Sequence, residues 1–449
     1  MQLATRKLLD RTFTGVGLLA VGLVAVALVA MLGPIITRGL GAFVFQETIE
    51  HRRFLLERFG RGDRSEIEAE WAEAQVAREA IHGRITQFES ELRKLDWDQR
   101  QQYAGPLRDL KDVLHELLGP FPDEPKPVMP RDQYGPTRWD RAQVALEHVL
   151  FIEEYDYSDP TQMGKKVLIP RANQFIGTSL APLFGELETN LDKMLLPRRT
   201  FYWRFLFDES VDAHLFGGIW PEVLGTLYLT LGAIVFAVPM GVISAIYLVE
   251  YARPESRLVG LLRTCISTLA GVPSIVFGLF GLAFFINTVH VSQSKSVLAG
   301  SLTLAILILP LIIRASEEAI RAVPATYKEA ALSLGAGRWR TVVTVLLPAA
   351  LPGILTGIVI SMGRAAGETA PIIFTAAVSV GQPLALWEAF SQPSPALPWN
   401  IYNLCTEHEA VDAIRHVQYG MVFALLALVL MLNGLAIVLR ARIAKRLRG

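Results

Sequence analysis

Long apolar windows without Asp, Glu, Lys or Arg alternate with charged segments along the chain. The windows are residues 12–37, 223–249, 264–294, 296–313, 341–363 and 418–439. A helix needs about 20 apolar residues to cross the roughly 30 Å hydrocarbon core of a membrane. Only a helix or a closed barrel satisfies its own backbone hydrogen bonds there. The pattern therefore predicts an all-α membrane protein with six transmembrane helices, of which the fourth is short.

Basic residues gather beside these windows and indicate an orientation. With six crossings, all four clusters fall on one face, and Lys and Arg favour the cytoplasmic face. Both termini are then expected to be cytoplasmic. The first window also resembles a signal peptide, but it is too long and no clear cleavage site follows it, so an uncleaved span is predicted. The clusters are Arg6, Lys7 and Arg11; Arg253, Arg257 and Arg263; Arg321, Lys328, Arg338 and Arg340; and Arg440, Arg442, Lys445, Arg446 and Arg448.

The segment between the first two windows is too long for a simple loop. Apolar residues repeat at steps of three and four through Ile81–Leu95 and again through Leu107–Leu117, where Gly119 and a proline follow. This spacing predicts an antiparallel helical hairpin. Residues 122–136 are rich in Pro and Asp and are expected to connect it to the next element. Residues 144–152 fit a helix or a strand equally well.

These features divide the chain into three expected parts. Residues 1–44 form an N-terminal tail and the first span, residues 45–216 a mostly helical periplasmic insert, and residues 217–449 a five-helix core. The chain carries 43 basic and 43 acidic residues, yet the insert has an excess of about eight negative charges. An aromatic run at residues 200–207 suits either the membrane–water interface or a core strand of the insert. Within the core, residues 315–348 are expected to form a cytoplasmic loop.

A spaced motif lies in this loop. It consists of Glu329-Ala330-Ala331, Gly335, Val345 and Leu347-Pro348. The small alanines let a short helix pack closely, Gly335 can end it, and the proline suits the start of the next helix. Lys328 and Glu329 can anchor the helix by ion pairs. The motif resembles the cytoplasmic loop of ABC importer permeases, which implies docking on an ATPase subunit; a surface helix without a partner is the alternative.

Two charged residues follow the fifth window. Arg364 lies about 20 Å along a helix counted from Leu351, where a charge costs on the order of 3 kcal/mol. We therefore expect it to face the interior of the bundle, with Glu368 one turn further on the same face as its partner. The planar guanidinium fork suits an oxyanion such as phosphate. A purely structural ion pair is the alternative.

Three segments are similar to the PstA family of phosphate ABC importer permeases. They are Arg364-Ala365-Ala366-Gly367-Glu368-Thr369-Ala370-Pro371, residues 245–252 and residues 271–281. The resemblance extends from Trp220 to the C-terminus. The insert departs from short members of the family, so its role is not implied by the resemblance.

The resemblance implies a multi-pass permease subunit that moves inorganic phosphate across the bacterial inner (cytoplasmic) membrane. It places Arg364, Glu368, Thr369, Arg314 and Glu317 on the substrate pathway, although Arg314 and Glu317 also fit snorkelling at the interface. It assigns Glu329, Ala330, Ala331 and Gly335 to ATPase coupling.

The implied partners are a second permease subunit (PstC-like), a dimer of PstB-like ATPase subunits, and a periplasmic PstS-like phosphate-binding protein. The chain has no Gly-x-x-x-x-Gly-Lys-Ser/Thr loop and no nucleophile–base pattern. ATP hydrolysis is therefore expected in the partner, and this chain is not expected to be an enzyme. No cofactor, nucleic acid or metal is expected. His408, Asp412 and His416 would share a helical face, which is more typical of a solvated surface than of a metal site.

Two other functions fit the sequence. One is an importer permease for another oxyanion, such as phosphonate, molybdate or sulfate. The other is a membrane receptor or assembly factor that acts through residues 45–216.

Overall fold

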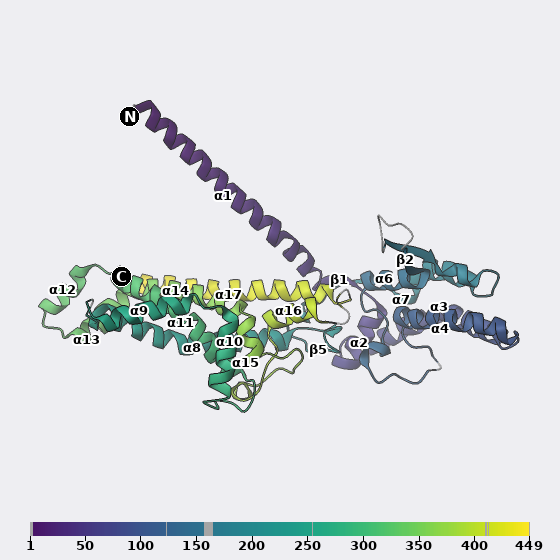
Figure 1. Cartoon of the computed structure of the whole chain (residues 1–449). Helices are drawn as coiled ribbons and strands as arrows, with labels where there is room; N and C mark the ends of the chain where they lie inside the picture. The colour runs from purple at the N-terminus through teal and green to yellow at the C-terminus, as the bar shows by residue number, and fades with distance from the viewer. Residues whose placement is uncertain are drawn as a thin grey trace. The chain divides into compact units, whose positions relative to one another are not determined.

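The chain folds into two compact units, both mostly helical (Figure 1). The computed structural model describes residues 3–122, 124–156, 165–253, 255–408, 411 and 413–448. Met1–Ala42 and Arg204–Gly449 form the first unit, which we call the membrane unit. Phe43–Trp203 forms the second, which we call the insert unit.

Five helical spans among the described residues are long and apolar enough to cross a membrane. Two of them contain π-helical turns, Tyr247–Tyr251 at the end of α8 and Val342–Leu346 between α13 and α14. The spans are built from α1 (Leu3–Leu40), α8 (Trp220–Ile246), α11 (Val297–Arg321), α13 (Arg338–Thr341) with α14 (Leu347–Gly367), and α17 (Arg415–Arg448). The prediction of an all-α membrane protein is confirmed.

The third predicted span is not a straight helix. It consists of α9 (Arg257–Ala270) and α10 (Ser274–Gly281), which meet at an angle of 103°. Pro273 lies at the break; its ring disfavours helical backbone at the preceding residue, and it has no N–H to donate. A π-helical turn, Leu282–Ile286, follows α10. The number of spans is therefore five, or six if this bent pair crosses the membrane as one.

Small residues bring the central helices of the membrane unit together. A Cβ atom at Gly241 of α8 would lie 2.6 Å from Cγ2 of Ile312 in α11, and one at Gly353 of α14 would lie 2.7 Å from Cβ of Ala319. Both approaches are closer than side chains permit, so α11 packs tightly between α8 and α14. Such contacts are typical of membrane helices, which associate by close packing rather than by exclusion of water.

Shorter elements complete the membrane unit. A buried cluster joins three of its segments: Glu222, in the first turn of α8, accepts hydrogen bonds from His214 Nε2 at 2.8 Å and from Asn400 Nδ2 at 3.0 Å. The elements are η2 (Trp203–Leu206), β5 (Ser210–Val211) paired with β6 (Phe216–Gly217), α12 (Ala325–Ser333), α15 (Ala370–Thr375), η6 (Glu388–Phe390) and α16 (Leu397–Thr406).

The insert unit contains the predicted helical hairpin. Helices α3 (Arg64–Leu92) and α4 (Trp97–Leu118) are joined by residues 93–96 and lie side by side (Figure 1). Each begins at an aspartate, Asp63 or Asp96, whose side chain accepts hydrogen bonds from the first backbone N–H groups. Gly119, with φ of 80°, ends α4. The remaining elements are α2 (Ile49–Phe59), α5 (Pro130–Gln133), α6 (Trp139–Leu150), η1 (Arg171–Phe175) and α7 (Ala181–Leu195).

Two small antiparallel sheets accompany these helices. Strand β1 (Val44–Glu47) pairs with β4 (Arg198–Phe201), which brings the two ends of the insert unit together. Strand β2 (Phe151–Asp156) pairs with β3 (Lys165–Pro170). Residues 144–152, for which the sequence favoured neither helix nor strand, contain both, because α6 ends at Leu150 and β2 begins at the next residue. The aromatic residues of the segment 200–207 differ in exposure: Phe201 is exposed, whereas Tyr202 is buried.

An apolar core holds the helices of the insert unit together. Its members follow the predicted steps of three and four along α3 and α4, and α6 and α7 cover them. They include Ile81, Ile85, Phe88, Leu92, Leu110, Leu114, Leu117, Val149, Leu183, Leu187 and Leu191.

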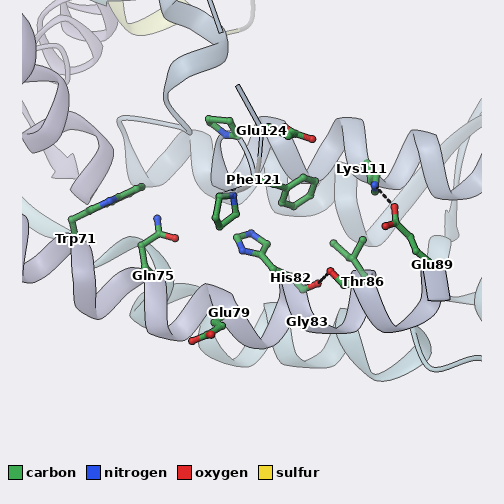
Figure 2. A pocket seen from close by; sticks show the side chains of 13 residues that line it. Trp71, Gln75, Glu79, His82, Gly83, Thr86, Glu89, Lys111, Phe121 and Glu124 are labelled. Atoms are coloured by element: carbon green, nitrogen blue, oxygen red, sulfur yellow. Dashed lines mark hydrogen bonds and ion pairs between the residues drawn. The ribbon is translucent and has the colours of Figure 1, made fainter. Parts of the chain in front are cut away.

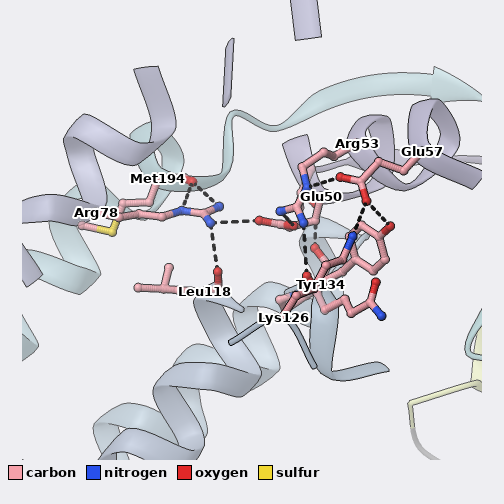
Figure 3. A network of polar contacts seen from close by, with 11 residues as sticks. Glu50, Arg53, Glu57, Arg78, Leu118, Lys126, Tyr134 and Met194 are labelled. Atoms are coloured by element: carbon pink, nitrogen blue, oxygen red, sulfur yellow. Dashed lines mark hydrogen bonds and ion pairs between the residues drawn. The ribbon is translucent and has the colours of Figure 1, made fainter. Parts of the chain in front are cut away.

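One arginine joins four elements beside this core (Figure 3). Arg78 is 1% exposed and donates to the backbone carbonyls of Met194 and Leu118, near the ends of α7 and α4. Its Nη1 also lies 2.9 Å from Oε1 of Glu50, in α2, which is fully buried. Burial lowers the pKa of Arg78, and Glu50 opposes this effect. The guanidinium thus satisfies two helix ends and one buried carboxylate at once.

A second carboxylate extends this network. Glu57 accepts a hydrogen bond from Nε of Arg53 at 2.9 Å and from the hydroxyl of Tyr134 at 2.8 Å. Burial raises the pKa of Glu57, but these two hydrogen bonds and the positive charges of Arg53 and Lys126 together leave the pKa below its ordinary value. Burial and the hydrogen bond to Glu57 raise the pKa of Tyr134.

Candidate functional site

Arg364 and Glu368 form an ion pair at the end of a membrane helix. Nε of Arg364 lies 3.1 Å from Oε1 of Glu368. The prediction that both lie on one helical face is wrong in detail, because α14 ends at Gly367 and Glu368 has extended backbone, with φ of −78° and ψ of 125°. The glutamate side chain nevertheless reaches back to its predicted partner.

Arg364 is not enclosed by the helices of this chain. Its side chain is 44% exposed, whereas that of Glu368 is 19% exposed. Within this single chain, Arg364 therefore does not face the interior of the helical bundle, contrary to the prediction. Glu368 engages only Nε, and neither terminal nitrogen of the guanidinium has a hydrogen-bond partner in the part of the chain that the structure describes. The four N–H donors of the two terminal nitrogens are left available for another group.

A small cavity borders the glutamate of this ion pair. Glu368 lines it together with Thr226 and Thr230 of α8, and its volume is about 10 Å³. That is room for about one water molecule, so the cavity is too small for an oxyanion. Thr369, the next predicted pathway residue, begins α15, and its hydroxyl donates to the carbonyl of Pro398 at 3.4 Å.

The other two predicted pathway residues lie on α11 and have separate partners. Arg314 is exposed and donates a hydrogen bond to the hydroxyl of Ser267 in α9. Glu317 is 5% exposed and lies 3.6 Å from Arg321, one turn further along. The structure records no contact between either residue and the Arg364–Glu368 pair among the described residues. No sequence pattern pointed to Ser267.

Helix α12 carries the predicted coupling residues. Glu329 and Ala330 are exposed, whereas Ala331 is buried. Gly335 has φ of 83°, its N–H donates to the carbonyl of Leu332, and the next N–H donates to that of Ala331. These are the two hydrogen bonds of a Schellman helix end, so Gly335 ends α12 as predicted.

Two further contacts fix the loop. Nζ of Lys328 lies 2.6 Å from the carboxylate of Glu250, at the end of α8. The sequence suggested that Lys328 forms an ion pair but not which residue it meets. Pro348 lies in the first turn of α14, as expected, and the π-helical turn Val342–Leu346 directly precedes that helix. The wider turn accommodates a residue without an N–H group.

No group of three His, Cys, Asp or Glu side chains that could hold a metal ion forms within the described residues. Asp412 of the sequence pattern lies outside the described residues. His408 hydrogen-bonds the carbonyl of Ala213 at 2.9 Å.

Comparison with known proteins identifies the family. Residues 237–449 match the model of the binding-protein-dependent transport system inner membrane component. Over 220 residues the chain is 36% identical to a probable ABC transporter permease protein, YqgI, of Bacillus subtilis, covering 47% of this chain and 74% of that protein. The chain belongs to this permease family. The resemblance to ABC importer permeases is thereby confirmed.

Other relatives in the family carry a more specific name. The phosphate transport system permease protein PstA 1 of Mycobacterium tuberculosis is 34% identical over 250 residues, covering 56% of this chain and 78% of that protein. The corresponding PstA of Mycobacterium leprae is 35% identical over 249 residues, covering 55% of this chain and 79% of that protein. The family match begins at residue 237, so the insert unit lies outside it.

Membership of the family determines the class of function. Its permeases are multi-pass components of the inner membrane that work with a substrate-binding protein. They are transport subunits rather than enzymes, and the ATPase activity lies in a separate subunit. The prediction of an ABC permease is confirmed.

Proposed function

We propose that the chain is the membrane-spanning permease subunit of an ATP-driven importer that moves inorganic phosphate across the bacterial inner membrane. Support comes from the family, from the PstA relatives at 34% and 35% identity, and from the residues that the membrane unit presents. The observation that carries the proposal is the partly engaged guanidinium of Arg364.

Arg364 is suited to bind phosphate in transit. Its two terminal nitrogens are available, and a guanidinium can donate two parallel hydrogen bonds to two phosphate oxygens. Glu368 holds Nε and so keeps the arginine oriented when no anion is bound. Because its negative charge repels phosphate, it also prevents the anion from being held too tightly. Release is as necessary to a permease as capture.

Thr369, Arg314 and Glu317 would form further parts of the pathway. Thr369 follows the ion pair directly, and its hydroxyl can donate to an anion if it leaves the carbonyl of Pro398. Arg314, exposed on α11, offers a second cation. Buried Glu317 would tune the charge near it.

The exposure of Arg364 implies a partner. A charge inside a membrane is costly unless protein or water surrounds it, so a second permease subunit (PstC-like) would cover this face and enclose the pathway. A periplasmic PstS-like protein would deliver phosphate. A dimer of PstB-like ATPase subunits would dock on α12. Glu329, Ala330, Ala331 and Gly335 would transmit the closing movement of the ATPase dimer to the membrane helices.

The basic clusters support the orientation. Residues 1–44 would supply a cytoplasmic N-terminus and the first span, residues 45–216 the periplasmic insert, and residues 217–449 the core with a cytoplasmic C-terminus. The coupling loop, residues 315–348, then lies on the cytoplasmic side. Cysteine-accessibility labelling in intact cells tests this topology.

Uptake of radiolabelled phosphate by cells carrying Arg364→Gln or Glu368→Gln tests the proposal. Loss of the charge-assisted hydrogen bonds should lower uptake by about tenfold or more in Arg364→Gln. Glu368→Gln should lower the maximal rate without weakening phosphate affinity. Arg108→Gln, the same change at an exposed arginine of the insert unit, is the control.

Equal membrane levels of all variants must be verified by immunoblot. Normal uptake in both Arg364→Gln and Glu368→Gln would refute the proposed pathway. Competition with sulfate, molybdate and phosphonate tests the substrate. Uptake that one of these anions inhibits more strongly than unlabelled phosphate would assign the permease to that anion.

A further inference from the structure

The insert unit contains a groove that the transport mechanism does not use (Figure 2). One wall is a single stripe of α3 that runs from Trp71 to Glu89. The other is formed by Lys111 of α4 together with Pro120, Phe121, Pro122 and Glu124. The cavity has a volume of about 820 Å³, within the range of small-molecule sites. Along the helix axis the stripe is about 27 Å long, so the groove is elongated. We call it the insert groove.

The groove is lined by carboxylates and aromatic rings. Three glutamates line it, against one lysine. Glu89 pairs with Lys111, and Glu124 lies 3.0 Å from Nε2 of His115. Glu79 has no ionic or hydrogen-bond partner in the described part of the chain. The lining therefore carries a negative charge that is not neutralised within it, which excludes phosphate as its ligand.

The chain's own lysine shows what this lining recognises. The ammonium group of Lys111 pairs with Glu89 and lies 6.0 Å from the centroid of the Phe121 ring. An alkylammonium group is thus held between a carboxylate and an aromatic face, a combination that favours cations. The ring of His82 meets the same phenyl ring edge to face, with centroids 4.9 Å apart. Glu79 and Trp71 also line the groove. The guanidinium groups of Arg53 and Arg78 already lie over the Trp71 ring, at 4.3 Å and 4.8 Å from its centroid. Glu79 is the carboxylate of the lining that has no cationic partner among the described residues.

We propose that the insert groove binds a linear aliphatic polyamine. One amino group would meet Glu79, with the aliphatic chain along the apolar edges of Phe121 and His82. A second would approach Glu89 or Glu124, in competition with their present partners. Glu79 and Glu89 are ten residues apart, about 15 Å along α3, so a ligand with spaced amines matches the groove better than a compact cation. The insert unit has a net charge of about −6, which would draw cations toward it.

Spermidine binding to the full-length chain in phosphatidylcholine nanodiscs tests the proposal by isothermal titration calorimetry. Zwitterionic lipid avoids binding of the polyamine to the bilayer. Glu79→Gln should weaken binding by about fivefold, the value of a partly exposed ion pair. Glu188→Gln, the same change at an exposed position of α7 outside the groove, should leave the affinity unchanged. Phe121→Leu should weaken it through loss of the aromatic ring.

Three results would overturn the proposal. The first is the absence of a saturable spermidine signal with the unaltered chain. The second is a loss of binding in Glu188→Gln as large as that in Glu79→Gln. The third is equally strong binding of 1,8-octanediol, which is linear but uncharged. Saturable binding of tetralysine without binding of spermidine would instead assign the groove to a basic segment of a protein. Phosphate uptake is measured separately, so failure here leaves the proposed transport function untouched.

Discussion

Replacing Arg78 by methionine tests how the insert unit is held together. Methionine keeps an aliphatic side chain of similar length but removes all five donors. The change leaves the carbonyls of Met194 and Leu118 without their partner. It also leaves Glu50, which is fully buried, with one remaining ionic partner, Arg53, at 3.1 Å. Two helix ends and one carboxylate lose their common contact in a single substitution.

The cost follows from the burial of this group. Removing one partner of a buried ion pair costs about 3–5 kcal/mol when the other charge is left without compensation. Arg53 still compensates part of the charge of Glu50, so we expect a cost of about 3 kcal/mol, at the lower end of this range. Each 1.4 kcal/mol is a factor of ten in an equilibrium constant. Local opening of the insert unit should therefore become at least about 100-fold more frequent.

Hydrogen–deuterium exchange of the full-length protein, followed by mass spectrometry, measures this opening. Peptides at the ends of α4 and α7 should exchange at least about 100-fold faster in Arg78→Met. The control is Arg84→Met, on the same helix, where the arginine pairs with Glu186 near the surface. There the effect should be far smaller, since water replaces the lost partner.

Two outcomes decide the matter. Exchange in Arg78→Met that matches Arg84→Met would refute the reasoning, because burial would then make no difference. Adding Glu50→Gln to Arg78→Met removes the buried charge that Arg53 alone compensates only in part, and should restore at least about tenfold of the lost protection. No recovery would mean that the buried charge is not the source of the cost.

Two further predictions concern single positions. Gly335→Ala forces a left-handed backbone on alanine, which should cost about 1 kcal/mol at the end of α12. It should therefore lower phosphate uptake at normal protein levels. Gly337→Ala, where φ is −70°, is the control and should leave uptake unchanged; equal effects of the two substitutions would contradict the prediction. The pKa of Glu57 lies below its ordinary value of 4.5, so its contribution to stability is present above that value and lost as the pH falls through the lowered pKa. Tyr134→Phe removes one stabilising hydrogen bond and should move acid unfolding of the insert unit to higher pH, as followed by tryptophan fluorescence; an unchanged midpoint would count against it.

The sequence by itself determined those features that depend on length and periodicity. An apolar window of about 20 residues can satisfy its backbone only as a helix in lipid, so the spans follow from composition. The steps from Ile81 to Leu92 place one face of α3 in the core whatever surrounds it. Gly335 was recognisable as a helix end because few other residues adopt its conformation without strain.

The tertiary structure decided how individual polar groups are used. Arg78 follows Ala74 and precedes Ile81 at core spacing, a signal that an arginine belonged inside, but its partners come from α2, α4 and α7. The third window was predicted as one span, and the angle of 103° between its two helices depends on how α9 and α10 pack.

The same holds for the proposed pathway and for the ends of the insert. Exposure of Arg364 depends on which helices stand beside α14, and the pairing of β1 with β4 joins segments about 150 residues apart. Local patterns report the preference of a residue for water or for apolar surroundings. They do not show which distant groups will contact that residue, because those contacts depend on the packing of the whole chain.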